Sequence, residues 1–176
     1  MGVLDNIAIG IHMLWSRLKV RSPFIRALKS LEKTQADVLM RVLHDNKITE
    51  FGKKYGLSEI SSVSEFRNQV PIHDYDDLEP YIKRQQEGHR SLTTEAPVYY
   101  ARTSGTTGSY KDIPLTESGI TQIKHFQKQL AYSLWSQTDF FKGTILGFSS
   151  PRFEGKLSNG IPYGSTSGAI YDSLSS

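Results

Sequence analysis

The chain has 176 residues, of which 38% are hydrophobic, 22% charged and 11% aromatic. This length suits one domain, or at most two small ones, and the composition is globular, which excludes wholesale disorder and collagen. The formal charge is +3, from 21 Lys and Arg against 18 Asp and Glu, so electrostatics gives little reason to expect a nucleic-acid partner. The absence of Cys excludes disulfides, thiolate metal sites and a cysteine nucleophile, and it leaves the cytoplasm as the default compartment.

The first apolar segment, residues 7–15, raises the question of a membrane segment. It is far too short to span a bilayer and follows Asp5 rather than a basic region, so we predict no membrane span. Because Arg17, Lys19 and Arg21 come next, a surface-seeking amphipathic helix is one interpretation. The interpretation that we favour is a first helix laid against the domain.

Helical patterns dominate the first half of the chain. Apolar residues recur three and four positions apart between Phe24 and Leu43, which predicts one helix that Ser22 caps and that runs to about Asn46. Pro23 suits the first position of that helix.

Shorter helices are expected after this one. Ser64 is the expected cap of a helix that stops ahead of Pro71, and Asp74 is expected to start another turn. Pro80 is expected to begin a further helix that ends at Gly88.

The pattern changes after residue 90. Residues 98–103 are β-branched and aromatic and predict a strand, a Ser, Gly and Thr loop follows at 104–109, and extended structure resumes at 113–115. Thr116 is expected to cap a long amphipathic helix, and residues 144–148 predict a second buried strand. We therefore predict an α/β chain with a helical N-terminal portion, residues 1–90, and an α/β portion, residues 91–176, that is incomplete in this chain.

The loop between the first two strands carries the chemistry. Gly105 and Gly108 allow positive φ, so that successive backbone N–H groups can face one concavity that suits phosphate oxygens, and Lys111 adds a cation. The loop is no Walker A motif, because Tyr110 precedes Lys111 and Asp112 follows it. From the residues alone, a phosphate site and a plain solvated loop both remain open.

Several motifs together resemble known families. Residues 103–108 (TSGTTG) with Lys111 closely resemble the first ATP-binding motif of the adenylate-forming superfamily. The upstream chain is similar to the N-terminal region of the Gretchen Hagen auxin-responsive family, and the match runs from about Leu31 to Leu134. The segments that carry it are residues 49–56 (TEFGKKYG), 66–72 (FRNQVPI), 75–82 (YDDLEPYI) and 112–116 (DIPLT).

The resemblance implies an acyl acid amido synthetase, which uses ATP and Mg²⁺ to activate a small carboxylic acid as an acyl adenylate and then joins it to an amino acid. It implies the start of the mixed sheet of an adenylate-forming large domain, cut short here, so that the chain alone is expected to be inactive. By the resemblance, the β- and γ-phosphates would be held by Ser104, Gly105, Thr106, Thr107, Gly108 and Lys111, with Lys111 the catalytic candidate. The alternative is a truncated, non-catalytic module that binds nucleotide or a protein partner.

Two other clusters are interpreted as structural. Asp74 and Asp77 have the spacing of a helix capping box, which we favour over a metal site at residues 73–77. The glycine-rich stretch 155–168 is expected to be a loop without chemistry.

Overall fold

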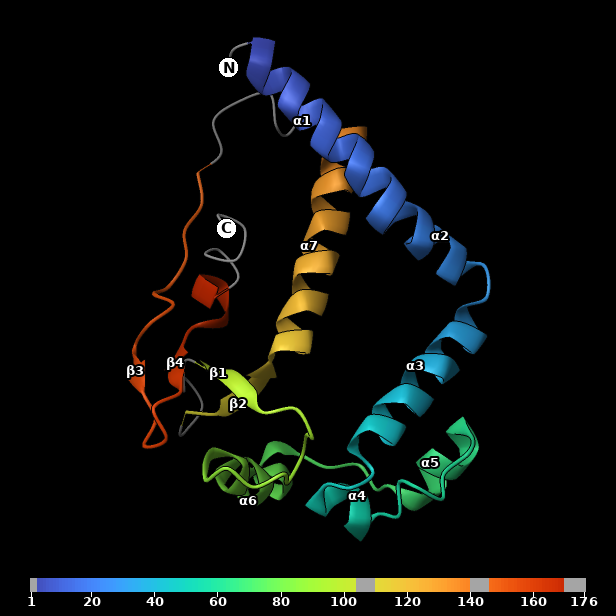
Figure 1. The fold of residues 1–176 in the computed structure, drawn as a ribbon, viewed down its shortest axis with the longest axis vertical. Coiled ribbons are helices and arrows are strands. Elements are labelled where there is room, and N and C mark those ends of the chain that lie inside the picture. Colours follow the sequence, from blue (N-terminus) through green and yellow to red (C-terminus); the bar gives the residue numbers. More distant parts are fainter. Residues whose placement is uncertain (1–2, 104–109, 140–145, 170–176) are drawn as a thin grey trace. The chain divides into compact units, whose positions relative to one another are not determined.

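The structure is a computed structural model that describes residues 3–103, 110–139 and 146–169 (Figure 1). It forms two compact units, one made of Met1–Thr34 and Thr121–Phe148 and the other of Gln35–Ile120 and Ser149–Ser176. We call them the N-terminal unit and the sheet unit. The expected division near residue 90 stays a prediction.

The N-terminal unit begins with an unbroken helical run (Figure 1). The α-helix α1 (Val3–Ser16) passes through a π-helical turn, η1 (Arg17–Arg21), into α2 (Ser22–Leu28). The expected cap at Ser22 is therefore wrong, because the Ser22 hydroxyl donates to the Arg17 carbonyl, 2.9 Å away, inside a helical run that is already formed. Pro23 does lie in the first turn of α2, as predicted. No helix in the described ranges is long and apolar enough to cross a membrane.

The single helix expected up to Asn46 is two helices. It breaks after Leu28, where the Lys29 and Ser30 N–H groups each donate three residues back, and α3 (Leu31–Asn46) starts afresh. The Ala27 carbonyl accepts from the Ser30 N–H and also from the Thr34 hydroxyl, 3.1 Å away, so the first turn of α3 is tied to the end of α2.

Three further helices follow α3 in the sheet unit: α4 (Glu50–Lys54), α5 (Val63–Gln69) and α6 (Tyr75–Gln86). Leu43, Leu57 and Ile60 form the buried centre of a hydrophobic core in this unit. The partly buried side chains packed on it are Leu39, Met40, Phe51, Tyr55, Phe66 and Val70.

Helix caps decide where α5 begins. Ser62, not the expected Ser64, caps α5, since its hydroxyl accepts from the Glu65 N–H at 3.1 Å. The Glu65 carboxylate in turn accepts from the Ser61 N–H, and Ser64 lies one residue inside the helix. Both serines fit the spacing of a cap, but only Ser62 has a Glu three residues later to complete the cap.

Helix α6 is capped as expected but is longer than expected. Asp74 and Asp77 form the predicted capping box. Because α6 starts directly after Asp74, Pro80 lies inside it rather than at its start, and Gly88, with φ of +93°, follows its end.

Four strands form a mixed sheet in the order β2-β1-β4-β3, which confirms the predicted fold class. They are β1 (Pro97–Arg102), β2 (Asp112–Thr116), β3 (Gly155–Lys156) and β4 (Pro162–Gly164). β1 pairs antiparallel with β2 and parallel with β4, and β3 pairs antiparallel with β4. The helix α7 (Glu117–Gln137) follows β2, and the Thr116 hydroxyl accepts from the Gly119 N–H at its start, as predicted.

The strand expected at residues 144–148 is wrong over its described part. Residues 146–148 adopt no regular structure, and Leu146 and Phe148 are highly exposed. In the described ranges no strand pairs with them, and an apolar run becomes a strand only where a partner takes its backbone hydrogen bonds.

Candidate phosphate-binding site

The predicted loop lies between the two strands of a hairpin. Arg102 ends β1 opposite Asp112, which begins β2, and one further pair closes beyond the strands. There the Thr103 N–H donates to the Lys111 carbonyl at 3.0 Å, and the Lys111 N–H donates to the Thr103 hydroxyl at 3.2 Å. The two ends of the loop are therefore held side by side.

Of the predicted site residues, the structure describes only Lys111. Ser104, Gly105, Thr106, Thr107 and Gly108 lie outside the described residues. What the structure supplies is the base of the hairpin, with Lys111 at the point where the loop returns to β2.

An ion pair forms the neck of this hairpin. The Arg102 guanidinium donates two hydrogen bonds to the Asp112 carboxylate, at 2.8 and 2.9 Å, and both side chains are largely buried. The bonds to Asp112 raise the pKa of Arg102. The guanidinium also lies 3.6 Å from the ring centroid of Tyr163 in β4, which ties the neck to the parallel strand.

The first and last residues of α6 both support this neck. Tyr75, the first residue of α6, accepts from the Asp112 N–H through its hydroxyl at 2.9 Å, and Gln86 donates to the Asp112 carboxylate at 3.4 Å. The capping box at Asp74 fixes where α6 begins and hence where Tyr75 lies. Burial raises the pKa of the Tyr75 phenol, so it stays a neutral hydrogen-bonding group.

Lys111 is exposed and lies against α6. Its ammonium is 5.1 Å from the ring centroid of Tyr75, a cation–π arrangement. Within the described part of the chain no carboxylate forms an ion pair with Lys111, whereas the Arg102 charge is balanced by Asp112. Lys111 therefore contributes a positive charge at the base of the loop that has no ion-pair partner among the described residues.

Sequence reasoning missed Arg102 and Tyr75 as parts of this site. An antiparallel hairpin that pairs Thr103 with Lys111 also places Arg102 opposite Asp112, so the opposite charges were a usable signal. For Tyr75 the sequence carried no comparable signal beyond its position after the cap, because its hydrogen bond with Asp112 joins residues 37 positions apart.

The two clusters set aside as structural have structural contacts. His73 accepts or donates a 2.7 Å hydrogen bond with the Tyr55 hydroxyl and packs on the Phe51 ring. The glycine-rich stretch is not the loop that the sequence predicted, because β3 and β4 lie in it. A Cβ at Gly164 or Gly168 would collide with the backbone of Arg152, so these glycines allow close packing beside β1.

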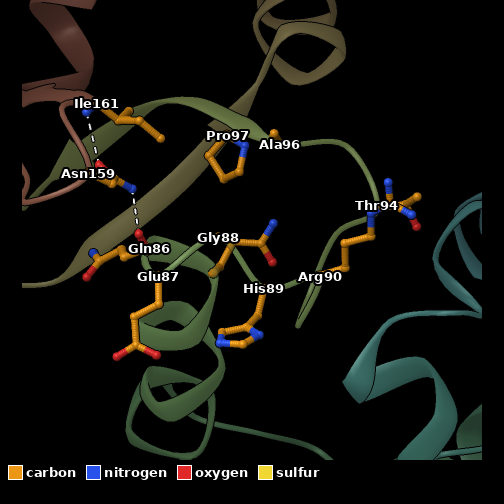
Figure 2. Close-up of a pocket in the computed structure, with 11 residues that line it drawn as sticks. Gln86, Glu87, Gly88, His89, Arg90, Thr94, Ala96, Pro97, Asn159 and Ile161 are labelled. Carbon is orange, nitrogen blue, oxygen red and sulfur yellow. Dashed lines mark hydrogen bonds between the residues drawn. The ribbon is translucent and has the colours of Figure 1, made fainter.

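A shallow hollow of about 560 Å³ lies at the other end of α6 (Figure 2). Asn159 bridges its rim, donating to the Gln86 carbonyl at 2.6 Å and accepting from the Ile161 N–H at 3.0 Å. These contacts join the tail of the chain to the end of α6, whose Gln86 also reaches Asp112. Gln86 thus links the rim of the hollow to the neck of the hairpin.

Comparison with known proteins identifies relatives of this architecture. The sequence model of a protein family, described as the GH3 family N-terminal domain, matches residues 21–176. The indole-3-acetic acid-amido synthetase GH3.3 of Arabidopsis thaliana is 29% identical over 154 residues, covering 78% of this chain and 25% of that protein. The jasmonoyl–L-amino acid synthetase JAR4 of Nicotiana attenuata is 28% identical over 146 residues, covering 81% and 25%.

A solved structure shares the fold. The GH3.15 acyl acid amido synthetase superposes with a TM-score of 0.76 at 24% sequence identity, over 86% of this chain and 28% of that one. The chain spans about a quarter of the length of the curated relatives that it matches. The resemblance to the Gretchen Hagen proteins is thereby confirmed, and the chain belongs to the GH3 family, whose matched members are amido synthetases.

Proposed function

We propose that this chain is the N-terminal part of an ATP-dependent acyl acid amido synthetase. In this proposal the loop at residues 104–109 and Lys111 hold the β- and γ-phosphates of ATP, the pyrophosphate that leaves when the acid is adenylated. The observation that carries the proposal is the braced hairpin, which holds the two ends of the loop together and brings an exposed ammonium to its base. Membership in a family of amido synthetases supports the reaction class.

The described residues fit a phosphate group. Lys111 is an exposed cation with no carboxylate paired to it in the described ranges, and the anionic Asp112 beside it is neutralised by Arg102. Mg²⁺ bound to ATP supplies further charge neutralisation and needs few protein ligands, because phosphate oxygens and water complete its coordination.

The chain's own residues have distinct tasks in this proposal. Adenylation develops negative charge on the departing pyrophosphate, and the Lys111 ammonium stabilises that charge as it forms. Tyr75 positions Lys111 through its ring, and the Arg102–Asp112 neck fixes the end of β2 from which Lys111 extends. Catalysis of this kind depends on donors that are in place before charge develops.

The names of the relatives indicate the chemical classes of the two substrates, not the individual compounds. The matched proteins are named for indole-3-acetic acid and for jasmonoyl conjugation, so we propose a small carboxylic acid and an amino acid as the two substrates here.

The test is acid-dependent exchange of pyrophosphate into ATP, measured on the full-length native gene product and on the 176-residue chain. We expect exchange from the former with a suitable acid and none from the latter, because the chain covers a quarter of its relatives. Titration of the 176-residue chain with Mg·ATP is expected to show binding. Binding without exchange by the native product would favour the alternative, a non-catalytic nucleotide-binding module, and no binding at all would remove the loop as a phosphate site.

A further inference from the structure

The first helical run carries a continuous apolar stripe on its outer surface. Five large apolar side chains of α1 and η1 are between 45% and 65% exposed. A helix turns about 100° per residue, so these side chains fall within an arc of about 100°. The exposed stripe consists of Ile7, Ile11, Leu14, Trp15 and Leu18.

This stripe is not the face by which the helix packs. Met13, Ser16 and Val20 are the buried residues of the same run, and their spacing places them on the side of the helix opposite the stripe. The helix therefore has one face turned inward and a second, apolar face that is largely exposed, where the Lys128 ammonium of α7 lies 5.3 Å from the Trp15 ring centroid. Soluble proteins rarely leave a contiguous apolar patch without a partner.

Positive charge gathers around the stripe. Residues 6–31 contain no Asp or Glu and five cations, Arg17, Lys19, Arg21, Arg26 and Lys29. Since the whole chain carries only +3, the rest of it carries a net −2. Arg17 and Lys19 precede and follow Leu18, so they flank the stripe on its two sides.

Three of these cations line one hollow of about 590 Å³. Arg17, Arg21 and Arg26 lie there with Leu18, Ile25 and Tyr132, all within the N-terminal unit. Among the residues that the structure describes, no carboxylate forms an ion pair with any of the three arginines. Unpaired guanidinium groups beside exposed apolar side chains suit a surface that offers both phosphate groups and hydrocarbon.

We propose that the helical run Val3–Leu28 is an interfacial anchor that lies on an anionic lipid bilayer. The stripe enters the boundary between headgroups and acyl chains, Trp15 lies at the interface, and the five cations contact lipid phosphates. The charge favours this occupant over a second copy of the chain, which would bring two groups of five cations together. The family model starts at residue 21, so the stripe precedes the domain that the family shares.

Binding to vesicles tests the anchor directly. The 176-residue chain has two Trp, so a Trp135→Phe background leaves Trp15 in the stripe as the reporter. The probes are vesicles of phosphatidylcholine alone and vesicles with about a third phosphatidylglycerol, with binding measured by sedimentation and by Trp15 emission. We expect binding to the anionic vesicles, with a blue shift of the Trp15 emission. Binding should be weaker in about 1 M salt than in about 0.1 M salt, because the Debye screening length falls from about 10 Å to about 3 Å.

Two variants test the contributions of the stripe and of the charges to vesicle binding separately. Ile11→Asp is expected to abolish the blue shift, and Arg17→Gln with Lys19→Gln is expected to weaken binding roughly 25-fold, about fivefold for each cation. The matched controls are Ile72→Asp, at a fully exposed isoleucine of the sheet unit, and Lys53→Gln with Lys83→Gln, two exposed lysines there. Both controls are expected to bind as the parent does.

Three results would overturn the proposal. One is no sedimentation with anionic vesicles, and another is vesicle binding that Ile11→Asp leaves unchanged. The third is a dimer in analytical ultracentrifugation that Ile11→Asp dissociates, which would assign the stripe to a second copy. The Gln variants alter only exposed or half-exposed side chains, so they keep the test valid even where Ile11→Asp fails to fold.

Discussion

At the scale of single residues, the proposed chemistry depends most on Lys111. We expect Lys111→Ala in the full-length native product to lower kcat/KM for adenylation about 10²-fold, the usual effect of losing one donor that stabilises transition-state charge. Lys111→Arg keeps the charge and is expected to recover part of the activity. Pyrophosphate exchange measures both variants.

The matched control for Lys111 is Lys83→Ala on α6. Lys83 is exposed and pairs with Glu79 one turn away, so its removal takes away a charge near the site without touching the hairpin. Exchange by Lys111→Ala at the parent rate would exclude Lys111 from the mechanism, and an equal loss in both variants would reduce its role to general electrostatics.

Two neighbouring tyrosines of β1 are expected to respond oppositely to loss of the hydroxyl. The Tyr99 hydroxyl donates to the Arg152 carbonyl at 2.7 Å, whereas the Tyr100 hydroxyl is fully buried and has no hydrogen-bond partner among the described residues. Tyr99→Phe should lower the free energy of unfolding by about 1 kcal/mol, and Tyr100→Phe should leave it unchanged or raise it by about 1 kcal/mol. Urea unfolding at pH 7 distinguishes the two, and a clear loss in Tyr100→Phe would reveal a partner for its hydroxyl.

Tyr100 also gives stability a specific pH dependence. Burial raises the pKa of its phenol to about 12, compared with about 10 in the unfolded chain. The protonated phenol therefore favours the folded state, and this contribution, on the order of 2 to 3 kcal/mol, is complete below pH 10 and is lost as the pH rises to 12. Tyr100→Phe should show a smaller fall in unfolding free energy between pH 9 and pH 11 than the parent, and equal falls would contradict the assignment.

At the scale of the elements, the hairpin depends on the Arg102–Asp112 neck. Arg102→Gln or Asp112→Asn leaves the other charge largely buried without its partner, and we expect each to lower the free energy of unfolding by about 2 kcal/mol. The double variant should lose less than the sum of the two, because it leaves no unpaired charge. A double-mutant cycle in urea measures the coupling.

A second ion pair provides the control for this cycle. Arg84 and Glu50 have the same bidentate geometry, with both distances 2.7 Å, but they lie in solvent. Water screens such a pair, so removing it should cost clearly less than breaking the neck. Equal effects of the two pairs would mean that burial does not set the strength of the neck.

Element types were easier to predict from the sequence than element ends. The capping box at Asp74, the cap at Thr116 and the two extended segments around the loop follow from local chemistry, and the structure has all three. The cap expected at Ser22 was wrong because α1 and η1 already form a helix directly upstream of it, although Pro23 does lie in the first turn of α2. Local patterns cannot tell a cap from a helical residue where the helix already exists upstream.

At the scale of the whole molecule, the resemblance implied a mixed sheet, but the sequence did not show which segments would form all of its strands. The strands β3 and β4 are two and three residues long and lie in a stretch rich in Gly and Ser, so no periodicity signals them. They exist because β4 pairs with β1 about 60 residues earlier in the chain. The strand expected at 144–148 fails, over its described part, for the converse reason: it has apolar residues but no partner.

The two proposed sites lie on different compact units, and this predicts that they act independently. Lys111 belongs to the sheet unit and the exposed stripe to the N-terminal unit, and the residues assigned to the two sites are different. Changes at sites without shared partners usually add, so Lys111→Ala should leave vesicle binding unchanged, and Ile11→Asp should leave the dissociation constant for Mg·ATP unchanged.

The combined variant completes the measurement. Each single variant should lose one activity, and Lys111→Ala with Ile11→Asp should lose both by the same factors as the singles. If Mg·ATP alters vesicle binding of the parent chain, the reciprocal change in nucleotide affinity must appear when vesicles are present, because coupling between two binding sites is mutual. Such a paired change would show that the nucleotide site and the membrane site are coupled rather than independent. No change in either titration would support two separate functions on one chain.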